Sequence, residues 1–96
     1  MLRVEFKPGT AEYLKNKGGN LLIFLGSYSG CFVGKVPAIM LDSAMPRGNF
    51  DSYSVIKVEG VNVYMDSEIS KLSGVIKVWE EKNLIWSNLY HEYLPE

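Results

Sequence analysis

The strongest constraint on the fold is a hairpin signal in the middle of the chain, YSVIKVEGVNVYMD at residues 53–66. Apolar and polar residues alternate on both sides of Glu59 and Gly60, and alternation around a two-residue turn that ends in glycine is typical of two antiparallel strands. Both faces of these strands keep some apolar side chains. We therefore expect a sheet that is at least partly covered on each face.

Other stretches also have strand character. LRVEF at residues 2–6 alternates apolar and charged residues, and NLLIFLG at 20–26 is an almost continuous apolar run, as in a central strand. CFVGKVPAIML at 31–41 predicts a strand in which Gly34 and Pro37 mark a bulge or an edge position. The sequence therefore predicts a β-rich protein.

The C-terminal third predicts a second hairpin, GVIKVWEEKNLIWSNLY at residues 74–90, with EEKN at 80–83 as its turn. We expect this hairpin to bury both Trp79 and Trp86 in the core, although an exposed aromatic patch for a partner is the alternative. The last segment, HEYLPE at 91–96, is expected to be a fraying tail with His91 exposed.

Two short helices complete the pattern. Thr10 is expected to cap a helix that runs through Lys17 and ends at a Gly-Gly pair, and either Asp66 or Ser67 is expected to cap a single turn. The side chains expected to face inward are Ala11, Tyr13, Leu14, Ile69 and Leu72. Strands followed by short helices and hairpins predict an α+β fold of mostly antiparallel strands.

Length and composition limit the classes of function. Ninety-six residues suit one domain, 1–96, and 47% apolar residues suffice for a core. Ten basic and eleven acidic residues form no block of one sign, so we expect no nucleic-acid partner. The longest apolar run, residues 21–25, is too short to span a bilayer, and MLRVEFKPG lacks the features of a signal peptide. We expect no membrane contact and a cytoplasmic location.

The single cysteine, Cys31, is the main candidate for chemistry. It cannot form an internal disulfide, which fits a reducing compartment. Metal clusters need three or four soft ligands. A homodimer would supply two copies of Cys31, with a carboxylate such as Asp42 or Asp66 completing the site. The alternatives are a small thiol that packs as a hydrophobic side chain, and a nucleophile assisted by Lys35. No catalytic constellation is visible, so we expect a protein that is not an enzyme.

A second candidate site lies in the polar segment DSAMPRGNFD, residues 42–51. It combines Met45, Arg47 and Phe50 with proline and glycine, which favours a loop. Exposed methionine, arginine and aromatic side chains are typical of protein interfaces. The segment is therefore the expected contact for a protein partner.

Two further motifs carry a family resemblance. GSYSG, made up of Gly26, Ser27, Tyr28, Ser29 and Gly30, resembles a Gly-Gly-Cys-Ser-Gly ligand loop, and VEGVNVYMDSEISKLSGVIKV at 58–78 is similar to a signature of hairpin, capped short helix and strand. Together with the order of elements, they make the chain resemble the HesB/IscA-like proteins of iron–sulfur cluster biogenesis, the A-type carriers. The short CC/Se motif branch has the same length and also lacks a C-terminal cysteine motif.

The resemblance implies a HesB-like fold and a role as a carrier or accessory protein for iron or an iron–sulfur cluster. Tyr28 stands where the family has its first cysteine, and Cys31 follows three residues later. No Cys-Gly-Cys is present near the C-terminus. Two functions therefore stay open: a carrier with a reduced ligand set based on Cys31, and a family member without metal that acts as a binding module.

Overall fold

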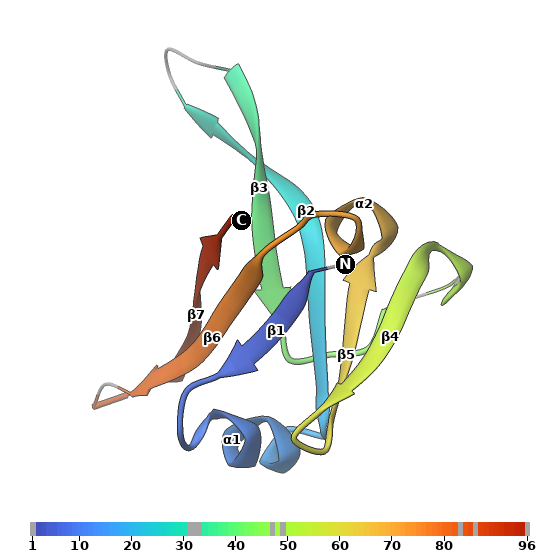
Figure 1. The fold of residues 1–96 in the computed structure, drawn as a ribbon. Coiled ribbons are helices and arrows are strands. Elements are labelled where there is room, and N and C mark those ends of the chain that lie inside the picture. Colours follow the sequence, from blue (N-terminus) through green and yellow to red (C-terminus); the bar gives the residue numbers. More distant parts are fainter. Residues whose placement is uncertain are drawn as a thin grey trace.

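A computed structural model describes residues 2–30, 34–46, 48, 50–82, 84–85 and 87–95, with the backbone alone described at 27–30, 34–38 and 50. Seven strands, two α-helices and one 3₁₀ helix follow one another in the described part of the chain (Figure 1). In order they are β1 (Arg3–Phe6), α1 (Thr10–Asn16), β2 (Asn20–Gly30), β3 (Gly34–Asp42), η1 (Phe50–Ser52), β4 (Tyr53–Val58), β5 (Val61–Asp66), α2 (Ser67–Ser70), β6 (Val75–Lys82) and β7 (Ser87–Leu94).

The strands form two mixed sheets. One sheet has the order β1-β6-β7 and the other β3-β2-β5-β4. β1 pairs with β6 and β2 with β5 in parallel, whereas the three hairpin pairs, β2–β3, β4–β5 and β6–β7, are antiparallel. The prediction of a β-rich α+β fold is confirmed. In the described part of the chain, no helix is long and apolar enough to cross a membrane.

The core lies between the two sheets and is closed by the two helices. Alternate residues of β2, β5 and β6 point into it, as the period of two in a half-buried strand requires. The cluster combines residues from both sheets and both helices: Leu2, Val4, Ala11, Leu14, Leu21, Ile23, Val61, Val63, Met65, Ile69, Ile76 and Val78.

The central hairpin is confirmed in detail. Val58 pairs directly with Val61, so the turn consists of Glu59 and Gly60. Their φ angles are 49° and 82°, the left-handed pair of a type I′ turn, which suits the twist of the flanking strands. In β5 the apolar face is fully buried, and Tyr64 on the opposite face is only 8% exposed. Both faces of this strand are therefore covered, as the alternation predicted.

The first helix begins differently from the prediction. Gly9, with φ of 89°, holds the N-cap position, and no side chain caps the helix. Thr10 already lies inside the helix, is 1% exposed, and donates its backbone N–H to the carbonyl of Lys7. Thr10 is therefore a packing residue, and its predicted role as cap is wrong. The helix ends as predicted at Gly18 and Gly19.

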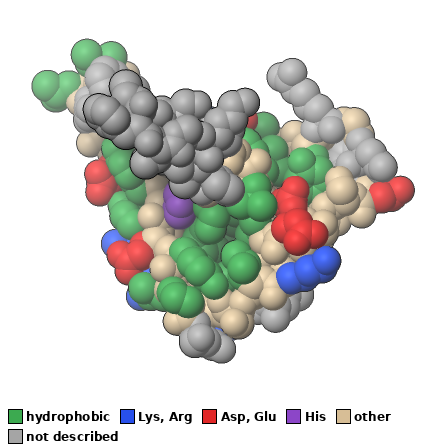
Figure 2. Space-filling view, turned by 90° about the horizontal axis from the view of Figure 1, so that it is seen from above, with side chains coloured by type: hydrophobic (Ala, Val, Ile, Leu, Met, Phe, Trp, Pro, Cys, Tyr) green, Lys and Arg blue, Asp and Glu red, His purple; other side chains and the backbone are tan. Residues whose placement is uncertain are grey.

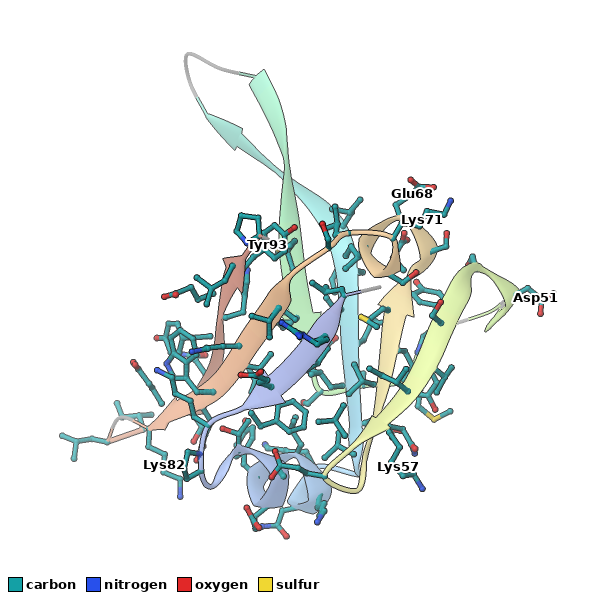
Figure 3. All side chains as sticks on the ribbon, in the orientation of Figure 1. Asp51, Lys57, Glu68, Lys71, Lys82 and Tyr93 are labelled. Atoms are coloured by element: carbon teal, nitrogen blue, oxygen red, sulfur yellow. The ribbon has the colours of Figure 1, made fainter. Side chains whose placement is uncertain are left out.

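The second helix follows the prediction at its start. The Asp66 carboxylate accepts a hydrogen bond of 2.9 Å from the backbone N–H of Glu68, which satisfies one of the free donors of the first turn. Ile69 is fully buried, but Leu72 is 36% exposed, so only one of the two predicted inward residues enters the core. Glu68 and Lys71 lie together on the outer side of this turn, 3.6 Å apart (Figure 3).

The last hairpin is longer than predicted, and its turn lies further along the chain. Glu80 to Lys82 continue β6, and Lys82 pairs with Ser87, so residues 83–86 connect the strands instead of residues 80–83. The predicted tail is wrong as well, because His91 to Leu94 continue β7 opposite Val75 to Val78. The physical reason is that the alternation of S-N-L-Y-H-E-Y-L runs unbroken to residue 94 and buries every second side chain in part.

Trp79 does not enter the core either. It is half-buried on the outer face of β6, where its ring stacks on Tyr90 at 6.2 Å between centroids and carries the Lys7 ammonium 4.0 Å from its centre. Its indole N–H donates to the Glu81 carboxylate at 3.1 Å. The indole N–H of this tryptophan therefore has a hydrogen-bond acceptor at the protein surface. Trp86 lies outside the described residues.

Candidate functional site

The most distinctive feature near Cys31 is a long arm. We use the name β2–β3 arm for the distal parts of the two strands, residues 26–30 and 34–38, which extend away from both sheets (Figure 1). Their register is continuous, from Gly26 opposite Ala38 to Gly30 opposite Gly34. The motif GSYSG, expected as a loop, is therefore strand up to Gly30. β3 is an edge strand, as the glycine and proline in its sequence predicted.

In the sequence, Cys31 follows Gly30, the last residue of β2. It belongs to the connection 31–33 between Gly30 and Gly34, and it lies outside the described residues. Tyr28 is opposite Val36 in the register and lies in β2, three positions before Cys31 in the sequence. The described backbone therefore places the motif GSYSG in the distal part of β2.

The base of the arm shows why Gly26 is glycine. A Cβ atom added at Gly26 would lie 2.6 Å from Cγ of Met40, closer than real Cβ contacts allow. Met40 is 41% exposed and therefore lies over the strand surface beside the glycine. The missing side chain lets the methionine cover this part of the arm.

We expect Gly26→Ala to lower the free energy of unfolding by about 1 to 2 kcal/mol, because Met40 must move to accept the new methyl group. In a Met40→Ala background the same substitution should be neutral or slightly stabilising, since alanine orders a strand better than glycine. Urea unfolding of the two single variants and the double variant measures this coupling. Equal effects of Gly26→Ala in both backgrounds would contradict the close contact.

The carboxylates suggested as further ligands lie far from Gly30 and Gly34, the described residues at the end of the arm. Asp42 stands at the other end of β3, eight residues from Gly34, which is about 27 Å at the usual rise per residue of a strand. Asp66 ends β5 and uses its carboxylate to cap α2. The structure therefore does not bring these two residues to the tip of the arm. Among the described residues, no group of three or more His, Cys, Asp and Glu side chains is arranged to hold a metal ion.

His91, expected in an exposed tail, is instead half-buried in β7. It is opposite Val78 on the inner face of the strand and lies beside hydrophobic side chains (Figure 2). Burial lowers the pKa of its imidazole below the ordinary value of 6.5. His91 is therefore part of the sheet. The alternation of more and less exposed side chains along β7 is the sequence signal that identifies this position.

The lowered pKa predicts a pH dependence of stability. The unfolded chain binds a proton at His91 near pH 6.5, whereas the folded chain binds it only at lower pH, so stability is lost as the pH falls below about 6.5. We expect the urea midpoint to decrease from pH 7.5 to 5.5, and to decrease less in His91→Gln, which does not titrate. The same decrease in both proteins would assign the effect to other groups.

The predicted partner contact is described only in part. Met45 is 48% exposed, as expected of a contact residue, while the neighbouring Pro46 is buried. Phe50 begins the 3₁₀ helix, but its side chain is outside the description, as is Arg47 altogether. The structure therefore brings Met45 to the surface and leaves the other two members of the set untested.

One pocket of about 220 Å³ lies away from the arm. It is lined by Glu5, Phe6, Lys7, Pro8 and Lys77, where the end of β1 meets β6. Its side chains supply lysine ammonium groups and one carboxylate, but no thiolate or imidazole. Such a lining lacks the soft ligands that an iron–sulfur cluster needs.

Comparison with solved structures identifies the architecture. The crystal structure of IscA with the [2Fe-2S] cluster is similar over 94% of this chain and 84% of that chain, with a TM-score of 0.60 and 12% sequence identity. The crystal structure of Escherichia coli SufA, involved in biosynthesis of iron–sulfur clusters, is similar over 95% of this chain and 80% of that chain, with a TM-score of 0.56 and 8% identity. These likenesses show that the fold is IscA-like.

Comparison of sequences identifies the family. No protein of curated function matches the chain. The model of the CC/Se motif containing family matches residues 2–94, which is nearly the whole chain and includes both the arm and the central hairpin. The chain therefore belongs to the CC/Se motif containing family and has the IscA-like fold.

Proposed function

We propose that this protein is a carrier or accessory protein for iron or an iron–sulfur cluster, with Cys31 as the thiolate that contacts the cargo. The proposal is supported by the fold shared with IscA and SufA, and by the sequence, in which Cys31 directly follows Gly30, the last residue of β2. A carrier that works with a free thiol suits a reducing, cytoplasmic location. The role is binding and transfer, not enzymatic catalysis.

The ligand count determines how such a carrier would bind its cargo. An iron–sulfur cluster is usually held by four thiolates, and this chain has one cysteine. A second copy of the chain would raise the number to two, and small thiols or the receiving protein would supply the others. Binding with so few protein ligands is expected to be weak, which suits a protein that passes the cargo on.

Anaerobic reconstitution with iron and sulfide tests the proposal. We expect visible charge-transfer absorption in the wild type and its loss in Cys31→Ser, because serine is a poor ligand for iron in a cluster. His91→Gln is the matched control, since it changes the other soft ligand type without touching the arm, and it should keep the colour. A colourless wild type, or colour that survives Cys31→Ser, would contradict the proposal.

A gain-of-function variant sharpens the test. Tyr28 stands at the position of the first cysteine in the related ligand loop, so Tyr28→Cys adds a second thiolate to the same arm. We expect more cluster per chain in Tyr28→Cys than in the wild type. No gain would argue against a site at the end of the arm.

The second candidate function is a binding module without metal. The observation in its favour is the exposure of Met45, at 48%, within the segment between β3 and β4. This function predicts no iron in the purified protein and loss of partner binding in Arg47→Ala without loss of stability. Iron that is retained by the wild type and lost in Cys31→Ser would favour the carrier instead.

A further inference from the structure

The pocket between β1 and β6 lies where the N-terminal strand leaves its sheet. Beyond the paired residues of β1, the Lys7 N–H still donates to the Val78 carbonyl at 3.1 Å. Pro8 then turns the chain towards α1 (Figure 1), and the Thr10 N–H closes this turn by donating to the Lys7 carbonyl. Hydrogen bonds before and after Pro8 therefore hold the backbone that forms the pocket.

Two opposite charges line this pocket without forming an ion pair. Glu5 and Lys77 are direct partners in the parallel register of β1 and β6. Neither side chain has a hydrogen bond or an ion pair in the described part of the chain. Opposite charges at neighbouring positions of a sheet usually stabilise each other by direct contact. Here both groups stay available to a bound molecule.

A second ammonium group is held at the pocket by Trp79. The Lys7 Nζ lies 4.0 Å from the centre of the Trp79 ring. The indole is fixed in turn by its hydrogen bond to Glu81 and by its stacking on Tyr90. The ring occupies one side of an ammonium group that has three N–H donors, so donors remain for an anion. The pocket therefore combines two positive groups with one negative group.

The remaining lining is apolar, and the volume is small. Phe6 packs partly against the core, and Pro8 has a rigid ring, so the two residues give the pocket a fixed apolar wall. The volume of about 220 Å³ is below the range of about 300 to 1,000 Å³ that is typical of ligand pockets. The occupant that fits is therefore one small molecule with an apolar part.

We propose that this pocket binds a free α-amino acid with an apolar side chain. The carboxylate of the zwitterion pairs with the two lysine ammonium groups, its ammonium group pairs with Glu5, and its side chain lies against Phe6 and Pro8. A simple anion is repelled by Glu5, and a simple cation is repelled by the lysines, so a ligand with both charges matches the lining best. The pocket contains neither Cys31 nor the β2–β3 arm, and the proposal is independent of the carrier function.

NMR titration of the Cys31→Ser protein with L-leucine tests the proposal without any contribution from iron. The indole N–H resonance of Trp79, identified by its loss in Trp79→Phe, reports on the pocket through Lys7. We expect a saturable shift with a dissociation constant on the order of 1 mM, because charge pairs that stay partly exposed to water are weak. Isoamylamine lacks the carboxylate of leucine and isocaproate lacks its amino group, so each should bind about fivefold more weakly.

Substitutions separate the pocket from general charge effects. Lys77→Gln and Glu5→Gln should each weaken leucine binding about fivefold. Glu92→Gln is the matched control for Glu5→Gln, because Glu92 is the neighbour of Lys77 on the other side but does not line the pocket. Lys57→Gln on β4 is the control for Lys77→Gln. Both controls should bind leucine like the parent, and the dispersion of each spectrum verifies that the variant is folded.

Three results would overturn the proposal. The first is the absence of a saturable shift at leucine concentrations about tenfold above the expected dissociation constant. The second is equal binding of leucine and isocaproate, which would show that Glu5 plays no part. The third is an equal loss of binding in Glu5→Gln and Glu92→Gln, which would assign the effect to the overall charge of this sheet face.

Discussion

Removal of residues 91–96 is expected to unfold the protein or to lower its melting temperature by about 15 °C or more. The truncation removes four of the eight β6–β7 pairs, from His91 opposite Val78 to Leu94 opposite Val75. It also removes Tyr93, whose ring packs against the core and whose hydroxyl donates to the Ser73 carbonyl at 2.6 Å (Figure 3). Loss of a fully buried aromatic side chain costs about 3 to 5 kcal/mol, and loss of the partly buried Tyr93 contributes part of this cost beside the four lost strand pairs.

The control is removal of Pro95 and Glu96 only, which leaves β7 complete. This shorter truncation should leave the melting temperature within a few degrees of the wild type. Thermal unfolding followed by circular dichroism compares the two. If the longer truncation melted like the wild type, residues 91–94 would be a tail, and the assignment of β7 would be wrong.

Ile76→Ala is expected to cost about 3 to 4 kcal/mol of folding free energy. Ile76 is fully buried in β6, the central strand of its sheet, where it is opposite Val4 on one side and Tyr93 on the other. Its truncation removes apolar contacts and leaves a cavity between the two sheets, which only partial relaxation can fill. The measurement is urea unfolding, with the slope checked against the wild type.

Val55→Ala serves as the comparison for this core variant. It removes part of a β-branched side chain from a strand, but the side chain is 53% exposed. We expect a cost below about 1 kcal/mol. Similar costs at the two positions would contradict the placement of the core between the sheets.

Most strands could be predicted from the sequence where alternation and turn chemistry agree. Glu59 and Gly60 determine the central hairpin, because a type I′ turn needs two positive φ angles and the flanking residues alternate in step. The last hairpin was misplaced because local propensity favours EEKN as a turn and LIW as a strand. The register is fixed instead by His91 and Tyr93 in the second half of β7, which are distant in sequence from the turn.

The placement of Thr10 shows the same limit. Its residue type is a good helix cap, but its side chain is needed in the core, and Gly9 can adopt the positive φ that turns the chain into the helix. Packing therefore overrides a local preference that is worth about 1 kcal/mol.

The sequence indicated a region for the candidate site, and the role of that region as a ligand site stays a prediction. GSYSG and Cys31 indicated one region of the chain, and the register confirms that the motif runs along the β2–β3 arm up to the cysteine segment. The sequence alone could not show whether Asp42 lies near the end of the arm, because this depends on the length of β3. The structure places Asp42 at the opposite end of β3 from Gly34.

The most direct test of the carrier function is the iron content of protein purified without oxygen. Wild type and Cys31→Ser are isolated in parallel, and iron and sulfide per chain are measured by elemental analysis, with circular dichroism to verify that both are folded. We expect iron in the wild type and its loss in Cys31→Ser. Equal iron in the two folded proteins, or none in either, would contradict a carrier that contacts its cargo through Cys31.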